Sequence, residues 1–149
     1  NAAMVTRCFL QKGAEAASFY PLWTDDEDTS NAVENINARL ETLPAPIDVM
    51  YLGMGEDGHF ASLFPCDDAS TFDADTGSVV PGYAPRPPHQ RISLSLKTIL
   101  QTQHLFLHVT GAEKRKMFEY AGSITATPSY PVSLLINARR HDLSVYIAE

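Results

Sequence analysis

The residues best placed to do chemistry lie in one short glycine-rich stretch, Gly53-Met54-Gly55-Glu56-Asp57-Gly58-His59. It directly follows residues 47–52, a compact apolar run with one acid, which is typical of a buried parallel strand. Glycines let the chain turn sharply at the carboxyl end of such a strand, where α/β proteins bind their ligands. His59 would then present an imidazole, the natural general base near pH 7, and Asp57 could orient that ring or tune its pKa. The alternative is a histidine with a purely structural role.

The same stretch formally matches the Gly-x-Gly-x-x-Gly pattern of dinucleotide-binding proteins. Three features argue against that interpretation. Glu56 and Asp57 put two carboxylates where a pyrophosphate would sit, and Pro65 follows Gly58 too soon for the long helix that should face the phosphates. The acid that should bind the ribose, about 20 residues further on, would fall in residues 73–78, which we expect to be a loop. We therefore predict that the protein uses no cofactor.

A second group of residues could bind an anion. Lys114 lies in the segment Thr110-Gly111-Ala112-Glu113-Lys114, which follows another apolar strand and opens a helix. Helix N-terminal amides attract anions, and a lysine in the first turn adds a point charge. Arg91, just before residues 92–96, is a further candidate cation. The alternative is that both side chains are simply solvated at the surface.

We predict no metal site. His104 and His108 have the spacing of a metal-binding pair on a helix, but residues 104–109 are expected to form a strand. On a strand, four residues span roughly 13 Å, which is too far to share one ion. His89 and His141 have no partners that would converge on a metal.

Composition and charge limit the classes of function. The chain has 149 residues, 44% of them hydrophobic and 19% charged, as expected of one globular domain. The net charge of −7 disfavours binding to nucleic acid or to anionic membranes, and no apolar run is long enough to span a bilayer. Residues 1–75 carry a net charge of −11 and residues 76–149 one of +4, so cations for an anionic ligand should come from the second half. Cys8 and Cys66 are expected to be reduced thiols of a cytoplasmic protein.

Helical and strand patterns alternate along the chain. We expect helices over residues 2–11, 32–43 and 112–121, and strands over 47–52, 92–96, 104–109 and 143–147. Asn1 is a suitable cap for the first helix, and Ser30 or Asn31 for the second. The alternation predicts an α/β protein with a mostly parallel sheet.

Several segments have weaker signals. Residues 18–23 are expected to form a short strand or a loop, residues 60–64 and 97–100 at most a helical turn each, and residues 131–136 a short helix or a strand. Residues 66–90 contain so many glycines and prolines that we expect one long surface loop there.

The motifs also resemble those of a known family. Residues 48–65, which read DVMYLGMGEDGHFASLFP, closely resemble the signature of 6-phosphogluconolactonases. The segments RISLSL from Arg91, HVTGAEKRKMF from His108 and Pro131-Val132-Ser133 are similar to further motifs of that family. Phe60 and Cys66 depart from it, since threonine and glycine are common at those positions.

The resemblance implies a fold, an activity and a division of labour within the site. The fold would be a three-layer α/β/α Rossmann-like sandwich whose N-terminal part is missing, because residues 1–149 match the carboxyl-terminal two thirds of such enzymes. The reaction would be hydrolysis of 6-phospho-D-glucono-1,5-lactone to 6-phosphogluconate in the pentose phosphate pathway. His59 and Asp57 would be catalytic. The substrate would be bound by the three glycines of the loop and by the two cations: Gly53, Gly55, Gly58, Arg91 and Lys114.

The resemblance also implies that this chain would be inactive alone and would associate with the missing segment or with another copy. Glucosamine-6-phosphate deaminases share the fold and have a similar Asp-Gly-His loop. Their loop continues to Asn-Glu-Pro, and its glutamate transfers protons, whereas this chain has Leu63-Phe64-Pro65. A deaminase-like isomerase and a non-catalytic module that binds sugar phosphates remain the alternatives.

Overall fold

The computed structural model describes residues 2–11, 13–25, 28–73, 77–138 and 143–149. Its helices are α1 (Ala2–Cys8), α2 (Thr29–Leu40), α3 (Leu96–Gln101), α4 (Ala112–Ser123) and α5 (Pro131–Asn137), together with the 3-10 helix η1 (Ala69–Phe72). Its strands are β1 (Val49–Gly53), β2 (Val79–Tyr83), β3 (Gln90–Leu94), β4 (His104–Thr110) and β5 (Leu143–Ala148). None of the helices in the described ranges is long and apolar enough to cross a membrane.

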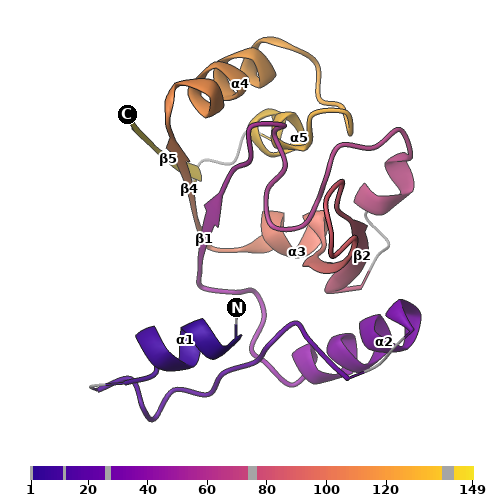
Figure 1. Cartoon of the computed structure of the whole chain (residues 1–149), viewed down its shortest axis with the longest axis vertical. Coiled ribbons are helices and arrows are strands. Elements are labelled where there is room, and N and C mark those ends of the chain that lie inside the picture. The colour runs from indigo at the N-terminus through magenta and orange to yellow at the C-terminus, as the bar shows by residue number, and fades with distance from the viewer. Residues whose placement is uncertain (1, 12, 26–27, 74–76, 139–142) are drawn as a thin grey trace.

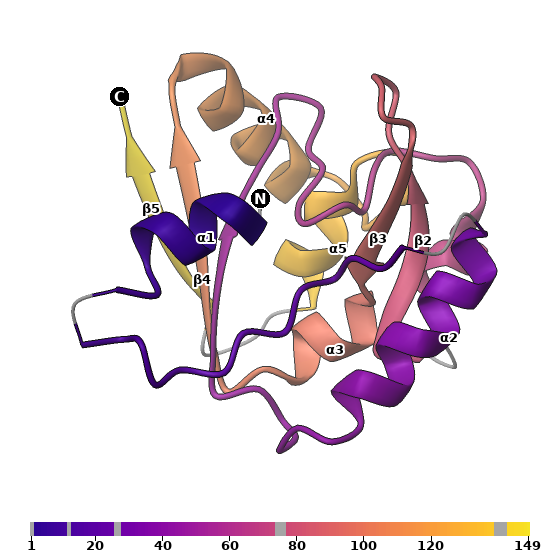
Figure 2. The same cartoon turned by 60° about the horizontal axis from the view of Figure 1, so that its bottom comes forward.

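A parallel sheet of β1, β4 and β5, in the order β1-β4-β5, forms the centre of the fold. Val49 of β1 pairs with His104 of β4, and Leu105 of β4 pairs with Leu143 of β5. Figures 1 and 2 show α4 and α5 on one side of this sheet and α1 on the other. The predicted α/β class with a parallel sheet is confirmed, and so is the layered arrangement.

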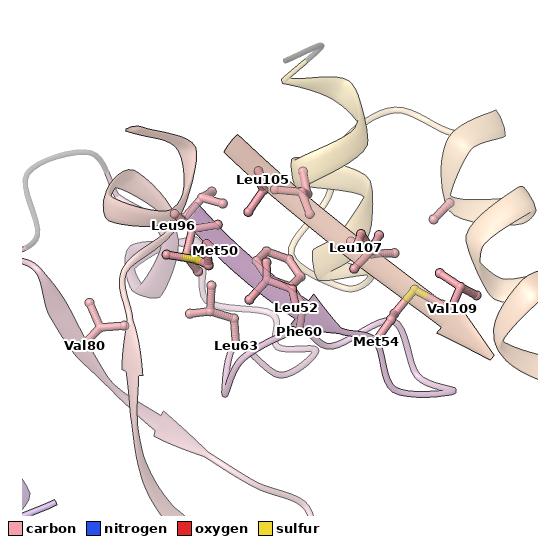
Figure 3. Packing of buried hydrophobic residues seen from close by; sticks show 14 residues of the cluster. Met50, Leu52, Met54, Phe60, Leu63, Val80, Leu96, Leu105, Leu107 and Val109 are labelled. Carbon is pink, nitrogen blue, oxygen red and sulfur yellow. The ribbon is translucent and has the colours of Figure 1, made fainter. Parts of the chain in front are cut away.

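The core lies between the sheet and the helices α3, α4 and α5. Alternate residues of β1 and β4 point into it: Met50, Leu52, Leu105, Leu107 and Val109, all at most 8% exposed. Figure 3 shows that Phe60 and Leu63, from the loop after β1, join the same cluster. Since both are 0% exposed, this loop is part of the core rather than a surface appendage.

The opposite face of the sheet is exposed. Val49, Tyr51 and Tyr146 are 58%, 64% and 57% exposed, although parallel sheets are usually covered on both faces. Helix α1 lies on this side, but it contains no buried residue. The helix predicted over residues 2–11 therefore forms, but it ends at Cys8 and contributes nothing to the core.

A second sheet was not expected from the sequence. Strands β2 and β3 form an antiparallel pair, with Val79 opposite Leu94, and α2 packs against it. The prediction of one long loop over residues 66–90 is wrong, because η1 and β2 both lie in that range. The strand tolerates Pro81 because a two-stranded sheet consists of edge strands, where a missing N–H costs little.

Other boundaries differ from the predictions for local reasons. Helix α2 begins three residues early, because Asp28 rather than Ser30 or Asn31 is its cap and accepts a hydrogen bond from the Ser30 N–H at 2.7 Å. Asn1 lies outside the described residues. Residues 60–64 form isolated antiparallel bridges instead of a helical turn, and residues 18–23 contain no strand. Residues 131–136 resolve to a helix, with Pro131 in its first turn.

Candidate active site

The glycine-rich loop follows β1 at its carboxyl end, at the edge of the parallel sheet where β4 also ends. The loop closes on itself through two backbone hydrogen bonds. The Gly55 N–H donates to the His59 carbonyl at 2.8 Å, and the Gly58 N–H donates to the Gly55 carbonyl at 3.1 Å. Gly58 adopts a φ of +80°, a left-handed conformation that favours glycine. The sequence therefore folds locally into a tight turn that presents the residues between the glycines.

Asp57 and His59 form the central pair of this turn. Nδ1 of the His59 ring lies 2.5 Å from Oδ1 of Asp57, and the same oxygen accepts the His59 backbone N–H at 3.1 Å. The His59 side chain is 31% exposed and the Asp57 side chain is 40% exposed, so the pair is accessible without being fully solvated. With Nδ1 directed at a carboxylate, the proton belongs on Nδ1 and the lone pair on Nε2. Nε2 makes no hydrogen bond within the described part of the chain, which is the arrangement a general base needs.

The three glycines differ in what the structure requires of them. A Cβ at Gly55 would lie 2.2 Å from Nδ1 of His59, so this glycine makes room for the imidazole. A Cβ at Gly53 would meet nothing within 4 Å, so this position does not need a glycine to make room for the pair. Gly58 packs beneath the turn, against the side chains of Met117 and Val132.

Helices α4 and α5 both contact the turn at Gly58. The Val132 N–H, at the start of α5, donates to the Gly58 carbonyl at 2.9 Å. A Cβ at Gly58 would approach Met117 Sδ of α4 to 3.5 Å. The glycine turn is thus anchored to segments more than 50 residues away in the sequence. Neither anchor was predicted, although Pro131-Val132-Ser133 resembles a motif of the family named in the sequence analysis.

Lys114 lies one helical turn before Met117 on α4, on the side of that helix that approaches the loop. The next two basic residues of α4 are paired with acids: Arg115 with Glu119 at 2.9 Å, and Lys116 with Glu113 at 2.8 Å. The hydrogen bond that the Lys116 ammonium donates to the Glu113 carboxylate raises the pKa of Lys116. Lys114 is half-buried and has no acidic partner among the described residues, so its charge remains available for an anionic ligand.

Arg91 belongs to the β2–β3 hairpin, which contacts the segment just after the loop. The Ser62 N–H, three residues after His59, donates to Ser93 Oγ of β3 at 3.1 Å. Arg91 lies two residues before Ser93, on the same side of the strand, and pairs across the hairpin with Gly82. A Cβ at Gly82 would lie 2.5 Å from the Ser62 carbonyl oxygen, so the two segments approach closely.

The Arg91 guanidinium donates to the carbonyl oxygens of Pro88 and Gln90. It has no carboxylate partner among the residues described. The hydrogen bonds to the hairpin backbone hold the side chain half-buried and leave its charge uncompensated.

The remaining histidines have structural surroundings. His108 packs its ring against Tyr51, with centroids 5.8 Å apart, and His89 stacks on Tyr83 at 5.2 Å. His104 is exposed, and His141 lies outside the described residues. Within the described ranges, no three histidines, cysteines or acids lie close enough together to hold a metal ion. No helix begins at the glycine loop either, since the next helical segment is η1.

Comparison with known proteins gives consistent matches. Residues 1–145 match the family described as glucosamine-6-phosphate isomerases/6-phosphogluconolactonase. The chain is 34% identical over 99% of its length to a 6-phosphogluconolactonase of Mesorhizobium japonicum, and 32% identical over its whole length to one of Neisseria meningitidis. A crystal structure of a 6-phosphogluconolactonase from Shewanella baltica covers the whole chain with a TM-score of 0.90 at 28% identity. The chain spans only 63–66% of the length of these proteins.

Proposed function

Because the chain belongs to the family of glucosamine-6-phosphate isomerases and 6-phosphogluconolactonases, we propose that it carries the catalytic residues of a 6-phosphogluconolactonase. Such an enzyme hydrolyses 6-phospho-D-glucono-1,5-lactone to 6-phosphogluconate, a step of the pentose phosphate pathway. The observation that carries the proposal is the Asp57–His59 pair, held at 2.5 Å on a glycine turn at the carboxyl end of a parallel strand. This pair supplies the base that a lactone hydrolase needs.

In the proposed reaction, Nε2 of His59 removes a proton from water while the water oxygen attacks the lactone carbonyl carbon. The tetrahedral intermediate then collapses, the bond from that carbon to the ring oxygen breaks, and His59 returns the proton to the departing oxygen. The product carries a hydroxyl where the ring was closed and a carboxyl group that ionises in water. Asp57 holds the imidazole in one tautomer and stabilises the charge that it acquires.

The developing oxyanion needs hydrogen-bond donors. The Gly55 and Gly58 amides were expected to contribute to substrate binding, but both donate to carbonyls within the loop. Glu56 and Asp57 lie between these two glycines in the chain, and their backbone N–H groups make no hydrogen bond within the described residues. We therefore propose that these two N–H groups donate hydrogen bonds to the oxyanion. The glycines shape the turn that exposes them.

Lys114 and Arg91 would bind the substrate phosphate. Both carry a charge that no acid neutralises in the described structure, and both belong to elements that contact the loop or the residues just after it. Binding the remote phosphate would position the lactone carbonyl near His59, so that part of the binding energy lowers the barrier of the chemical step.

The contact between Phe64 and His59 counts against the deaminase-like alternative. The Phe64 ring lies 4.5 Å from the His59 ring, centroid to centroid. The deaminase-like reaction would need a second group able to transfer protons beside His59, and the Phe64 ring at that place cannot transfer one.

The test compares two histidine variants. Hydrolysis is measured in an extended protein, meaning this chain joined to the part of the Mesorhizobium japonicum relative that it does not match. After subtraction of spontaneous hydrolysis, His59→Ala should lower the rate by about 10²–10⁴, the usual contribution of a general acid–base group. His104→Ala is the matched control, because this histidine is exposed on the distant sheet face, and it should change little. A folded His59→Ala protein within threefold of the parent rate would exclude the role.

A binding experiment separates this proposal from a non-catalytic module. If the extended protein binds 6-phosphogluconate but hydrolyses the lactone no faster than buffer, the chain binds sugar phosphates without catalysis.

A further inference from the structure

Asp57, Gly55 and Phe64 all lie next to the His59 ring. The Asp57 carboxylate contacts Nδ1, and the Gly55 backbone lies so close that a Cβ there would come within 2.3 Å of Cε1. The third group is the Phe64 ring, at a centroid distance of 4.5 Å and an interplanar angle of 36°. The proposed reaction gives Phe64 no role.

The hydrogen bond to Asp57 does not fix the imidazole by itself. Rotation about the Cα–Cβ and Cβ–Cγ bonds of His59 swings Nδ1 off the carboxylate and moves Nε2 with it, and among the described residues the bond to Asp57 is the one hydrogen bond of the ring that opposes this rotation. A second contact on the face of the ring removes that freedom. Offset or tilted aromatic pairs with centroids 4.5–7 Å apart are favourable geometries, and the Phe64–His59 pair lies at the short end of that range.

Phe64 is itself held in place by its neighbours in the chain. Leu63 is 0% exposed in the core, and its N–H donates to the Phe60 carbonyl at 3.0 Å. Pro65 restricts the backbone of the residue before it to extended conformations. The Cys66 N–H then donates to the Pro128 carbonyl at 3.3 Å. The backbone is thus fixed on both sides of Phe64, so the ring has a defined position against His59.

Phe64 is not a core residue, however. Its side chain is half-buried and lines a cavity of about 320 Å³ whose wall also includes Ser62, Tyr83 and Gln90. A ring needed only for stability would be enclosed by the core, as the Phe60 ring is. The Phe64 ring instead has His59 beside it and open space nearby.

We propose that Phe64 is a positioning residue for His59: its ring fixes the plane of the imidazole, so that Nδ1 stays on Asp57 and Nε2 faces the attacking water. Its importance for catalysis rests on the proposed function. The orientation of the His59 ring does not depend on the proposed function, and it can be measured in the chain without substrate.

The test reads the His59 tautomer directly. The chain is labelled with ¹⁵N-histidine, and the two ring nitrogens are observed at alkaline pH, where imidazoles are neutral. The His59 signals are assigned with His59→Gln. In the parent, the shifts should show the proton on Nδ1. Phe64→Leu should move both shifts toward a tautomer mixture, and Phe64→Tyr should restore the parent spectrum, because the cavity leaves room for one hydroxyl.

Phe106→Leu is the matched control, because Phe106 is a half-buried phenylalanine that contacts Tyr146 on the far face of the sheet. It should leave the His59 shifts unchanged. If Phe64→Leu melts too low for study, Phe64→Met takes its place, since methionine fills irregular space without a ring. In the extended protein, Phe64→Leu should lower kcat about tenfold and leave KM nearly unchanged, since the displaced group is the base rather than a binding residue.

The outcomes separate the two proposals. Unchanged His59 shifts in a folded Phe64→Leu chain would overturn the positioning role, whether or not the lactone is hydrolysed. Changed shifts that Phe64→Tyr restores would support it, even if the extended protein lacked activity and the proposed function failed.

Discussion

Replacing Gly55 by alanine displaces the proposed base without removing it. The added Cβ would lie 2.2 Å from Nδ1 and 2.3 Å from Cε1 of His59, and 2.6 Å from Oδ1 of Asp57. Ordinary contacts begin at 3.4 Å. The imidazole must therefore retreat by about 1.2 Å, a displacement at which catalytic groups lose roughly 10²-fold in rate.

The same shift should break the hydrogen bond between His59 and Asp57. That bond is 2.5 Å long, and a displacement of about 1 Å takes it to the limit of hydrogen bonding. We therefore expect Gly55→Ala to lose about 10²–10⁴ in kcat, as much as an acid–base group contributes. The free energy of unfolding should change by less than about 1 kcal/mol, because Gly55 lacks a left-handed φ and His59 can move toward solvent.

Gly53→Ala is the control, since it makes the same chemical change two residues earlier. A Cβ at Gly53 meets nothing within 4 Å, and its φ is not left-handed either. The assay is background-corrected lactone hydrolysis by the extended protein, with thermal melting and the ¹⁵N spectrum of His59 recorded for each variant. If Gly55→Ala matched Gly53→Ala in rate and in the His59 spectrum, the steric argument would be refuted.

Four further predictions follow from other contacts. Gly58→Ala should cost about 1–2 kcal/mol in thermal or chemical unfolding, because alanine must then adopt the φ of +80°. Phe60→Ala should cost about 3–5 kcal/mol by the same measurement, since the ring is 0% exposed; a loss below 1 kcal/mol would contradict its place in the core. Lys114→Ala should lower kcat/KM for the phosphorylated lactone and scarcely affect an unphosphorylated lactone; equal losses would show that Lys114 does not bind phosphate. Burial raises the pKa of the Cys66 thiol, so at pH 8 iodoacetamide should alkylate it more slowly than the exposed Cys8, as read by peptide mass spectrometry, and equal rates would contradict this.

The features that could be predicted from the sequence are those set by neighbouring residues. A run such as residues 104–109, followed by Thr110-Gly111 and an amphipathic segment, specifies a buried strand and then a helix, and β4 and α4 confirm it. Asp57 and His59 are two residues apart on a turn. Their contact therefore depends on local backbone geometry that the flanking glycines already indicate.

The features that could not be predicted depend on contacts between distant segments. Strand β2 contains only Val79 and Val80 as apolar signal before Pro81, and its pairing with β3 decides that it is a strand. Val132 anchors the glycine turn from 74 residues beyond Gly58, through a backbone hydrogen bond that the residue types do not indicate. Sequence patterns show which face of a segment can be buried, but not what buries it.

Helix α1 illustrates this limit most clearly. Its apolar residues Met4, Val5 and Cys8 recur at helical spacing, and the prediction of a helix there is confirmed. Yet Met4 is 49% exposed, and on the same side of the sheet Tyr51 is 64% exposed. An apolar helix side and an aromatic sheet face thus lie on one side of the molecule without burying each other. We expected association with a further segment or another copy from the resemblance, and this side is one place where apolar side chains of the described structure remain exposed.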